Sequence, residues 1–276
     1  MIVNTTIIFI KKVFLYVVLA YFVLVIFGLT YSDKLIFLPQ AISYQYSDDL
    51  VTIASKNADD GSEHAIVARL LINPTAKYTV LYSHGNAVDI GGLSNVQQKF
   101  FKHGYSVIIY DYSGYGLSKG SPSEQQVYND VQAVYDYLIN IKKLVPEQII
   151  SYGHSLGAAI ATDLAYTRPV AALVLENPFV TAFRVKTVYK LVPFDKFASI
   201  DKIGQVNTPV FITHSRDDNV IPFWHGEALF EKALNPKQYL WLDKAGHTDI
   251  THTEIFWPAL KTFISTLSPD KQMASQ

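Results

Sequence analysis

The sequence predicts an α/β fold in which a mostly parallel central sheet is covered by helices on both faces and is preceded by one transmembrane helix. Three observations lead to this prediction. Short apolar runs alternate with helical stretches from residue 78 onward, a pattern that is typical of a parallel sheet. A G-x-S-x-G motif follows one of these runs, at residues 153–157. An uncharged apolar run at residues 13–30 is long enough to cross a bilayer.

The strands and helices are expected in a regular order along the chain. Antiparallel strands come first, near residues 42–46, 50–56 and 64–72, with a turn at residues 59–61. The apolar runs of the parallel part follow at residues 78–82, 107–110, 148–152, 170–175, 210–213 and 239–242. The main helices are expected at residues 91–103, 122–141, 156–167, 223–233 and 253–267, and a polar tail starts at Ser268.

One helix start is indicated by its capping residues. In the stretch Ser121-Pro122-Ser123-Glu124, Ser121 is the expected cap and Pro122 occupies the first helical position. Glu124 stands three residues after this cap, the spacing at which a carboxylate can bind back to the cap N–H.

The composition fits one sizeable globular domain plus an apolar segment. The chain has 276 residues, a net charge of −1 and a hydrophobic fraction of 49%. A net charge of −1 does not indicate the excess of basic residues that is expected of a nucleic-acid-binding protein. Cysteine is absent, which excludes a disulfide, a zinc-thiolate site and a cysteine nucleophile. We expect residues 33–276 to form a single domain.

Residues 1–32 are predicted to be a signal anchor. The helix over about residues 13–30 would span roughly 27 Å, close to the thickness of the hydrocarbon layer. Lys11 and Lys12 precede it, so the positive-inside rule places the N-terminus in the cytoplasm and the following domain on the exported side. The alternative is a signal peptide cleaved near residues 30–32, which would give a secreted protein. The apolar run exceeds the usual signal-peptide core of about 7 to 15 residues, and this favours the uncleaved anchor.

The G-x-S-x-G motif is the sequence form of a nucleophile elbow. The apolar run at residues 148–150 leads directly into Gly153, Ser155 and Gly157. The turn from strand to helix is sharp, which strains the serine backbone and brings its flanking positions close to other backbone. Glycine suits both flanking positions because it has no Cβ. Ser155 is therefore the expected nucleophile.

A serine hydroxyl needs a base within hydrogen-bond reach and an acid that orients the base. The strand at residues 210–213 leads into a polar turn that holds Asp217 and Asp218, both possible acids. The strand at residues 239–242 leads into the loop that holds His247, the expected base. The order nucleophile, acid, histidine is the one that accompanies a G-x-S-x-G elbow.

Two backbone N–H groups are expected to stabilise the oxyanion. The residue after the nucleophile, Leu156, supplies the first. The second is expected in the loop after the strand at residues 78–82, from Asn86, with Ala87 as the neighbouring alternative. His84, in the same loop, is expected to brace it.

With these residues assembled, the chain resembles the α/β-hydrolase superfamily and its branch of membrane-anchored α/β-hydrolase-domain proteins, which includes protein depalmitoylases and related serine esterases. The resemblance covers nearly everything after residue 35. It is carried by the motifs at residues 84–87, 111–120, 153–157, 218–222 and 246–247. The family pattern H-G-x-x-D-x-x-V/I-P puts the acid four residues after a histidine, which selects Asp218 over Asp217. The chain departs from the family at Ser113, usually arginine, and at Ser215, usually glycine.

The expected fold is thus an α/β-hydrolase fold with a small cap insertion at about residues 177–208. The expected activity is serine hydrolysis of a carboxylic ester or thioester of an acyl or lipid-like substrate, through an acyl-enzyme. A serine aminopeptidase-like amide hydrolase is one alternative, and a non-catalytic, membrane-tethered binding protein on the same fold is the other. No cofactor is needed for this chemistry. His247, Asp249 and His252 are not expected to hold a metal, because a metal would compete with the histidine acting as base.

Overall fold

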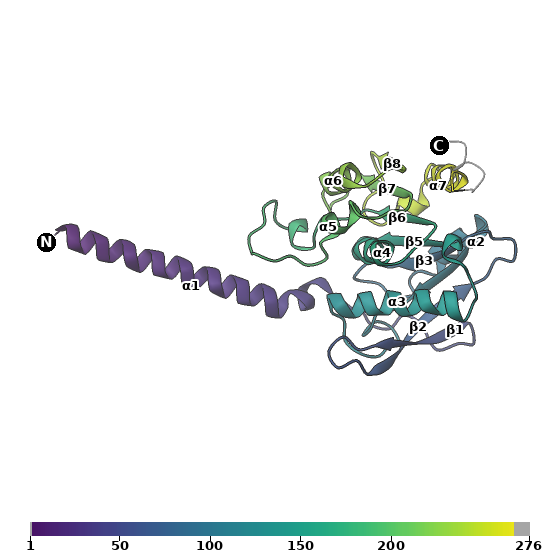
Figure 1. Cartoon of the computed structure of the whole chain (residues 1–276), viewed down its shortest axis with the longest axis horizontal. Helices are drawn as coiled ribbons and strands as arrows, with labels where there is room; N and C mark the ends of the chain where they lie inside the picture. Colours follow the sequence, from purple (N-terminus) through teal and green to yellow (C-terminus); the bar gives the residue numbers. More distant parts are fainter. Residues whose placement is uncertain (1, 268–276) are drawn as a thin grey trace.

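An eight-stranded sheet lies between two layers of helices in the computed structural model, which describes residues 2–267 (Figure 1). The polar tail predicted from Ser268 lies outside these described residues. The order of the strands across the sheet is β1-β2-β4-β3-β5-β6-β7-β8. Their bounds are β1 (Leu50–Lys56), β2 (Glu63–Leu71), β3 (Thr79–Ser83), β4 (Ser106–Tyr110), β5 (Ile149–His154), β6 (Ala172–Glu176), β7 (Val210–Ser215) and β8 (Lys237–Leu242).

The sheet begins antiparallel and continues parallel, as the sequence predicts. Strand β2 pairs antiparallel with both β1 and β4, and every later pair from β4 to β8 is parallel. The carboxyl ends of β3, β5, β6, β7 and β8 therefore lie along one edge, where sites form in sheets of this kind.

The strand predicted near residues 42–46 was wrong, because this segment is irregular. Its polar groups bind side chains of other loops. The N–H of Ser43 donates to a carboxylate oxygen of Asp89 at 2.7 Å, and the hydroxyl of Tyr44 donates to Asp111 at 2.5 Å. These bonds fix the segment without a partner strand.

The helices that pack on the sheet follow the predicted order with small shifts at their ends, whereas α1 begins 11 residues before and ends six residues after the span predicted at about residues 13–30. They are α1 (Ile2–Ile36), α2 (Ser94–Lys102), α3 (Glu124–Asn140), α4 (Leu156–Thr167), α5 (Ser199–Ile203), α6 (Trp224–Lys232) and α7 (Phe256–Ser265), with short 3₁₀ turns η1 (Pro146–Gln148), η2 (Phe183–Val185) and η3 (Ile250–His252). The predicted cap of α3, Ser121, was wrong. Ser123 has an extended backbone, and its hydroxyl oxygen accepts from the N–H of Gln126 at 3.2 Å, so Ser123 is the cap and Pro122 precedes the helix.

Side chains that alternate along the central strands fill cores on both faces of the sheet. In β3, Val80 and Tyr82 point to the face that α2 and α7 cover, whereas Leu81 points to the face that α3 and α4 cover. All three side chains are buried. This two-sided burial explains why the parallel strands are continuous apolar runs in the sequence.

Helix α1 projects away from the sheet (Figure 1). Its segment Thr6–Ile36 is long and apolar enough to cross a membrane. Large apolar side chains along it are exposed, including Phe14, Tyr16 and Val23, a surface that water does not favour. The helix ends three residues before Pro39, and the proline is consistent with this end.

The segment between β6 and β7 holds η2 and α5 and covers the region predicted as a cap. In Figure 1 it forms the green loop that extends from the sheet toward the C-terminal part of α1. Phe194, from this loop, packs so closely on α1 that its ring lies 3.0 Å from the position a Cβ of Gly28 would occupy. Glycine at this position permits the contact.

Candidate active site

Ser155 sits at a strained turn between β5 and α4. Its backbone has φ 56° and ψ −119°, a conformation that is costly for a residue with a side chain. The two flanking glycines are required by close packing: a Cβ on Gly153 would meet the carbonyl of Gly157, and a Cβ on Gly157 would meet the carbonyl of Ser83. The sequence motif thus folds into the sharp turn it predicts.

The structure brings Ser155, His247 and Asp218 into one hydrogen-bonded row. The Nε2 atom of His247 lies 3.0 Å from the Oγ of Ser155, and its Nδ1 atom lies 2.7 Å from the Oδ2 of Asp218. The three side chains come from the carboxyl ends of β5, β8 and β7. With Nδ1–H donating to the carboxylate, Nε2 is free to accept the serine proton.

Asp218 is held in its ionised form although its side chain is buried. Burial raises the pKa of this carboxyl group, but the bond from His247 and the bonds from two backbone N–H groups outweigh burial and leave its pKa below the usual value. The two backbone donors are Val220, at 2.8 Å, and Ile221, at 2.9 Å. An ionised carboxylate behind the imidazole stabilises an imidazolium ion.

The neighbouring Asp217 braces the loop of His247. It takes no part in the hydrogen-bonded row of Ser155, His247 and Asp218. Its Oδ1 accepts from the N–H groups of Ala245 at 3.0 Å and Gly246 at 2.9 Å. The hydroxyl of Ser215 donates to the same oxygen at 2.5 Å and accepts from the N–H of Ala245. Ser215, where the family usually has glycine, is therefore part of this brace.

Two side chains that the sequence did not single out as site residues hold the backbone of His247. The amide Nδ2 of Asn177 donates to the His247 carbonyl oxygen at 2.7 Å, and Nε2 of His154 lies 2.8 Å from the same oxygen. Burial lowers the pKa of His154, so its neutral imidazole donates through Nε2–H. The available clue was position, because Asn177 directly follows β6 and His154 lies inside the G-x-S-x-G motif.

Asn86 and Leu156, the expected oxyanion donors, both line the cleft that contains Ser155. Two hydrogen bonds of Asn86 hold its loop in place, one through the backbone and one through the side chain. Its carbonyl oxygen accepts from the hydroxyl of Tyr115 at 2.8 Å, and its side-chain amide donates to the carbonyl of Ile36, at the end of α1, at 2.9 Å. The loop that would carry an oxyanion donor is therefore attached to the end of α1.

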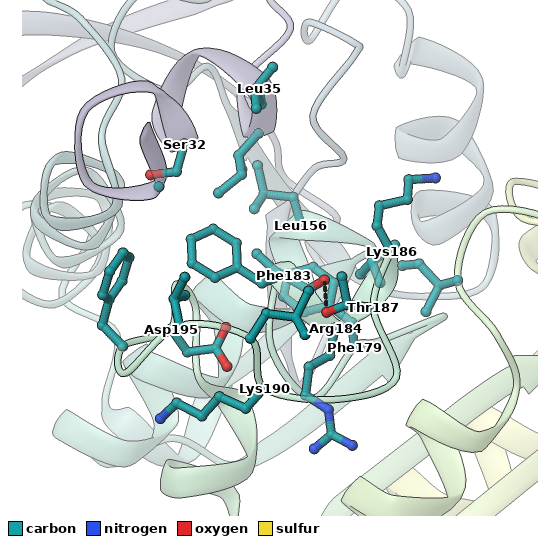
Figure 2. Close-up of a pocket in the computed structure, with 18 of the residues that line it drawn as sticks. Ser32, Leu35, Leu156, Phe179, Phe183, Arg184, Lys186, Thr187, Lys190 and Asp195 are labelled. Carbon is teal, nitrogen blue, oxygen red and sulfur yellow. Dashed lines mark hydrogen bonds between the residues drawn. The ribbon is translucent and has the colours of Figure 1, made fainter. Parts of the chain in front are cut away.

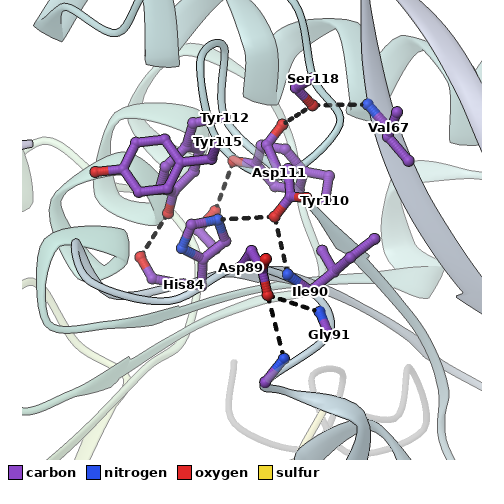
Figure 3. Close-up of polar contacts among 12 residues, drawn as sticks. Val67, His84, Asp89, Ile90, Gly91, Tyr110, Asp111, Tyr112, Tyr115 and Ser118 are labelled. Carbon is purple, nitrogen blue, oxygen red and sulfur yellow. Dashed lines mark hydrogen bonds and ion pairs between the residues drawn. The ribbon is translucent and has the colours of Figure 1, made fainter. Parts of the chain in front are cut away.

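His84 braces this loop from behind, as its position in the sequence suggested. Its buried ring stacks on Tyr112 with centroids 4.0 Å apart (Figure 3). Its Nδ1 lies 2.7 Å from the carbonyl oxygen of Gly85. Burial lowers the pKa of His84 to about 4 and raises the pKa of Asp111 to about 7. At pH 5 to 6 both groups are therefore mainly neutral, and their 3.8 Å contact is not an ion pair.

A cleft of about 670 Å³ opens over Ser155. Figure 2 shows Ser32 and Leu35 of α1 on one side of it and Phe183, Lys190 and Asp195 of the β6–β7 segment on the other. The lining is mostly apolar. A space of this size and character is in the range of sites for drug-sized ligands.

Within residues 2–267, no group of three or more histidine or acidic side chains is arranged to hold a metal ion. His247 uses both ring nitrogens in the row described above.

Comparison with known proteins gives consistent results. Residues 74–200 match the family described as serine aminopeptidase, S33. Human α/β-hydrolase domain-containing protein 17B is 40% identical over 196 residues, which are 70% of this chain and 68% of the human protein. The mouse protein 17C is 37% identical over 240 residues, which are 84% of this chain and 74% of the mouse protein.

The fold also matches solved structures. An esterase from Pyrococcus furiosus superposes with a TM-score of 0.67 at 18% identity, over 83% of this chain and 99% of the esterase. At this identity the likeness concerns the fold. The sequence relatives establish more, because the match is at 40% identity and extends over two thirds of the human protein. The chain is an enzyme of the α/β-hydrolase superfamily and belongs to the family of α/β-hydrolase domain-containing proteins 17.

Proposed function

We propose that the protein is a serine hydrolase that cleaves a carboxylic ester or thioester of a lipid-like acyl group. Ser155 Oγ attacks the carbonyl carbon while His247 Nε2 takes the serine proton, and Asp218 stabilises the resulting imidazolium. The N–H groups of Leu156 and Asn86 bind the oxyanion. The intermediate collapses, and the leaving alcohol or thiol takes the proton from His247.

The second half of the reaction repeats these roles with water. A water molecule gives a proton to His247 and attacks the acyl carbon of the acyl-enzyme. Collapse of the second intermediate releases the carboxylic acid, and the proton on His247 returns to Ser155. Water and substrate are the only reactants from outside the chain, and the proton on His247 is returned at the end of each half.

One observation carries this proposal: the row Ser155–His247–Asp218 has contacts of 3.0 Å and 2.7 Å and borders an apolar cleft. A serine at a strained elbow without a base would be inert. A polar substrate would leave the cleft walls poorly matched, whereas an acyl chain fits them.

The proposal is tested with the full chain in detergent and fluorophosphonate as the probe. Ser155→Ala should abolish both labelling and turnover of p-nitrophenyl esters. Ser121→Ala is the matched control, because this serine is exposed and lies outside the cleft, and it should label normally. Undiminished labelling of Ser155→Ala would remove Ser155 from the mechanism.

Amide hydrolysis is the second candidate, and the match to a family described as serine aminopeptidase favours it. The same catalytic row can cleave an amide if His247 protonates the leaving amine. Comparing turnover of p-nitrophenyl acetate with that of aminoacyl p-nitroanilides separates the two activities. We expect ester turnover to dominate, since the cleft is apolar and offers few partners for a free amino group.

We further propose that α1 is retained in the mature protein, with Lys11 and Lys12 in the cytoplasm and the catalytic domain on the exported side. The packing of Phe194 on Gly28 supports retention, because cleavage near residue 31 would remove the part of α1 that Phe194 contacts. Intact mass of the membrane-bound protein and protease accessibility of the domain in sealed vesicles test these two statements separately.

A further inference from the structure

The cleft over Ser155 extends along a part of α1 that the sequence assigns to the membrane. Leu24, Phe27 and Gly28 line it, and all three lie within the apolar run at residues 13–30. The lining continues through Ser32 and Leu35, toward Ser155. One wall of the cleft therefore lies at the depth of the lipid hydrocarbon.

These α1 residues form a single stripe. Their spacing of three or four residues, or multiples of it, places Leu24, Phe27, Gly28 and Leu35 on one face of the helix. From Leu24 to Leu35 the stripe rises roughly 17 Å along the helix axis. Ile26 lies on the opposite face and is exposed. The cleft is thus an elongated space that runs beside the helix.

The other wall is formed by residues 182–195, which we name the cap segment. Two contacts hold it against α1: Phe194 packs on Gly28, and the Nζ of Lys196, next to the segment, lies 3.1 Å from the carboxylate of Asp33. Both contacts fix the cap segment beside the exported end of α1.

The outer part of the cap segment has the character of a membrane-surface element. Val188, Tyr189 and Leu191 are exposed, with 63%, 77% and 54% of their surface accessible. Lys186 and Lys190 are exposed among them. Exposed apolar and aromatic side chains interleaved with lysines are typical of segments that insert into the headgroup layer.

We propose that the cleft between α1 and the cap segment opens sideways into the bilayer and takes the acyl chain of a fatty acyl ester or thioester directly from the membrane. Helix α1 is then a wall of the substrate site as well as an anchor. The chain passes from lipid to protein without contact with water, and its carbonyl carbon reaches Ser155 at the exported end. The inference rests on the proposed function, since it uses Ser155 as the nucleophile.

The first test measures acyl-chain preference with the full chain reconstituted in phosphatidylcholine vesicles. The measured quantity is the ratio of turnover of p-nitrophenyl palmitate to turnover of p-nitrophenyl acetate. Leu24→Trp fills the membrane end of the cleft and should lower this ratio by about tenfold or more. Ile26→Trp is the matched control, with the same change at nearly the same depth on the opposite face, and should leave the ratio unchanged. Equal ratios in the two variants would overturn the proposal.

The second test locates the chain directly. A long-chain alkyl fluorophosphonate with a diazirine at the chain end is allowed to react with Ser155 in vesicles and is then photolysed. Crosslinks are expected on Leu24, Phe27 and the cap segment. Crosslinks elsewhere in a protein that carries the phosphonyl group would overturn lateral entry and leave the serine mechanism intact. Absence of the phosphonyl group would instead count against the proposed function.

Discussion

The side-chain amide of Asn177 donates to the carbonyl oxygen of His247 at 2.7 Å, from the end of a different strand. Its Oδ1 accepts from the N–H of Ser215 at 3.0 Å, so one side chain ties the ends of β6 and β7 to the loop of the histidine. Asn177 has φ 46°, in the left-handed region that asparagine tolerates better than most residues. The position of the imidazole thus depends on a residue that does not contact it.

Replacing Asn177 should impair positioning more than binding. Asn177→Gly keeps the backbone conformation and removes the hydrogen bonds of the side chain with Gly246, His247 and Ser215. We expect kcat to fall roughly 10- to 100-fold with little change in KM. Asn177→Ala should lower kcat similarly and also reduce thermal stability, because alanine is strained at this φ. Steady-state kinetics and thermal melts of both variants measure these effects. An unchanged kcat in Asn177→Gly would contradict the positioning role.

Asp218 and Asp217 are adjacent but should respond differently to the same change. Asp218→Asn removes the carboxylate that orients His247, and we expect kcat to fall by about 10⁴, the loss known for this change in serine proteases. Asp217→Asn keeps an oxygen that can accept from Ala245 and Gly246, so its kcat should fall less than about tenfold. A larger loss in Asp217→Asn than in Asp218→Asn would reverse the assignment of the acid.

The buried carboxyl of Asp111 should make stability depend on pH. Its pKa in the folded protein is raised to about 7, so folding favours the neutral form. This contribution is complete below about pH 4, where the unfolded chain is also protonated, and is lost as the pH rises toward 7. The asparagine of Asp111→Asn cannot ionise, so the stability of this variant should not fall between pH 4 and pH 7 on account of residue 111.

The measurement is the melting temperature of the wild type minus that of Asp111→Asn between pH 4 and pH 9. We expect the difference to fall by several degrees from pH 4 to pH 7 and then to stay level. A constant difference across the whole range would show that Asp111 ionises normally in the folded protein.

The elbow should not tolerate a methyl group at Gly157. A Cβ there would collide with the backbone carbonyls of Ser83 and His84, which cannot move without disturbing β3. Gly157→Ala should therefore destabilise the fold by about 2 kcal/mol or more. Gly204→Ala is the control, because Gly204 has φ −72° and a Cβ there would come closest to the flexible side chain of Lys232, at 3.0 Å. The carbonyl oxygen of Lys232 would lie 3.4 Å from this Cβ, which is an ordinary contact. Chemical denaturation of both variants measures the difference.

Much of the fold could be predicted because it is encoded locally. The apolar runs of the parallel strands and the periodic helices are visible in short windows, and strand order limits where their loops can meet. The local pattern gave a wrong prediction at residues 42–46, where a strand was expected. There the contacts of Ser43 and Tyr44 with distant carboxylates take the place of a strand partner. The local pattern was also wrong about the cap of α3. Both Ser121 and Ser123 are residue types that can cap a helix, and the extended backbone of Ser123 and its bond from the N–H of Gln126 identify it as the cap.

The sequence by itself determined which groups are available to the site: a serine at a glycine-flanked elbow, then an acid and a histidine, each after its own strand, and an apolar segment at the start. The tertiary structure decided how these parts cooperate. It made Asp217 a brace of the loop that holds His247, brought the side chains of Asn177 and His154 to the carbonyl oxygen of His247, and made α1 a wall of the cleft. The physical reason is range: strand and helix patterns repeat within a few residues, whereas contacts between loops far apart in the chain depend on sheet register and on the packing of whole elements.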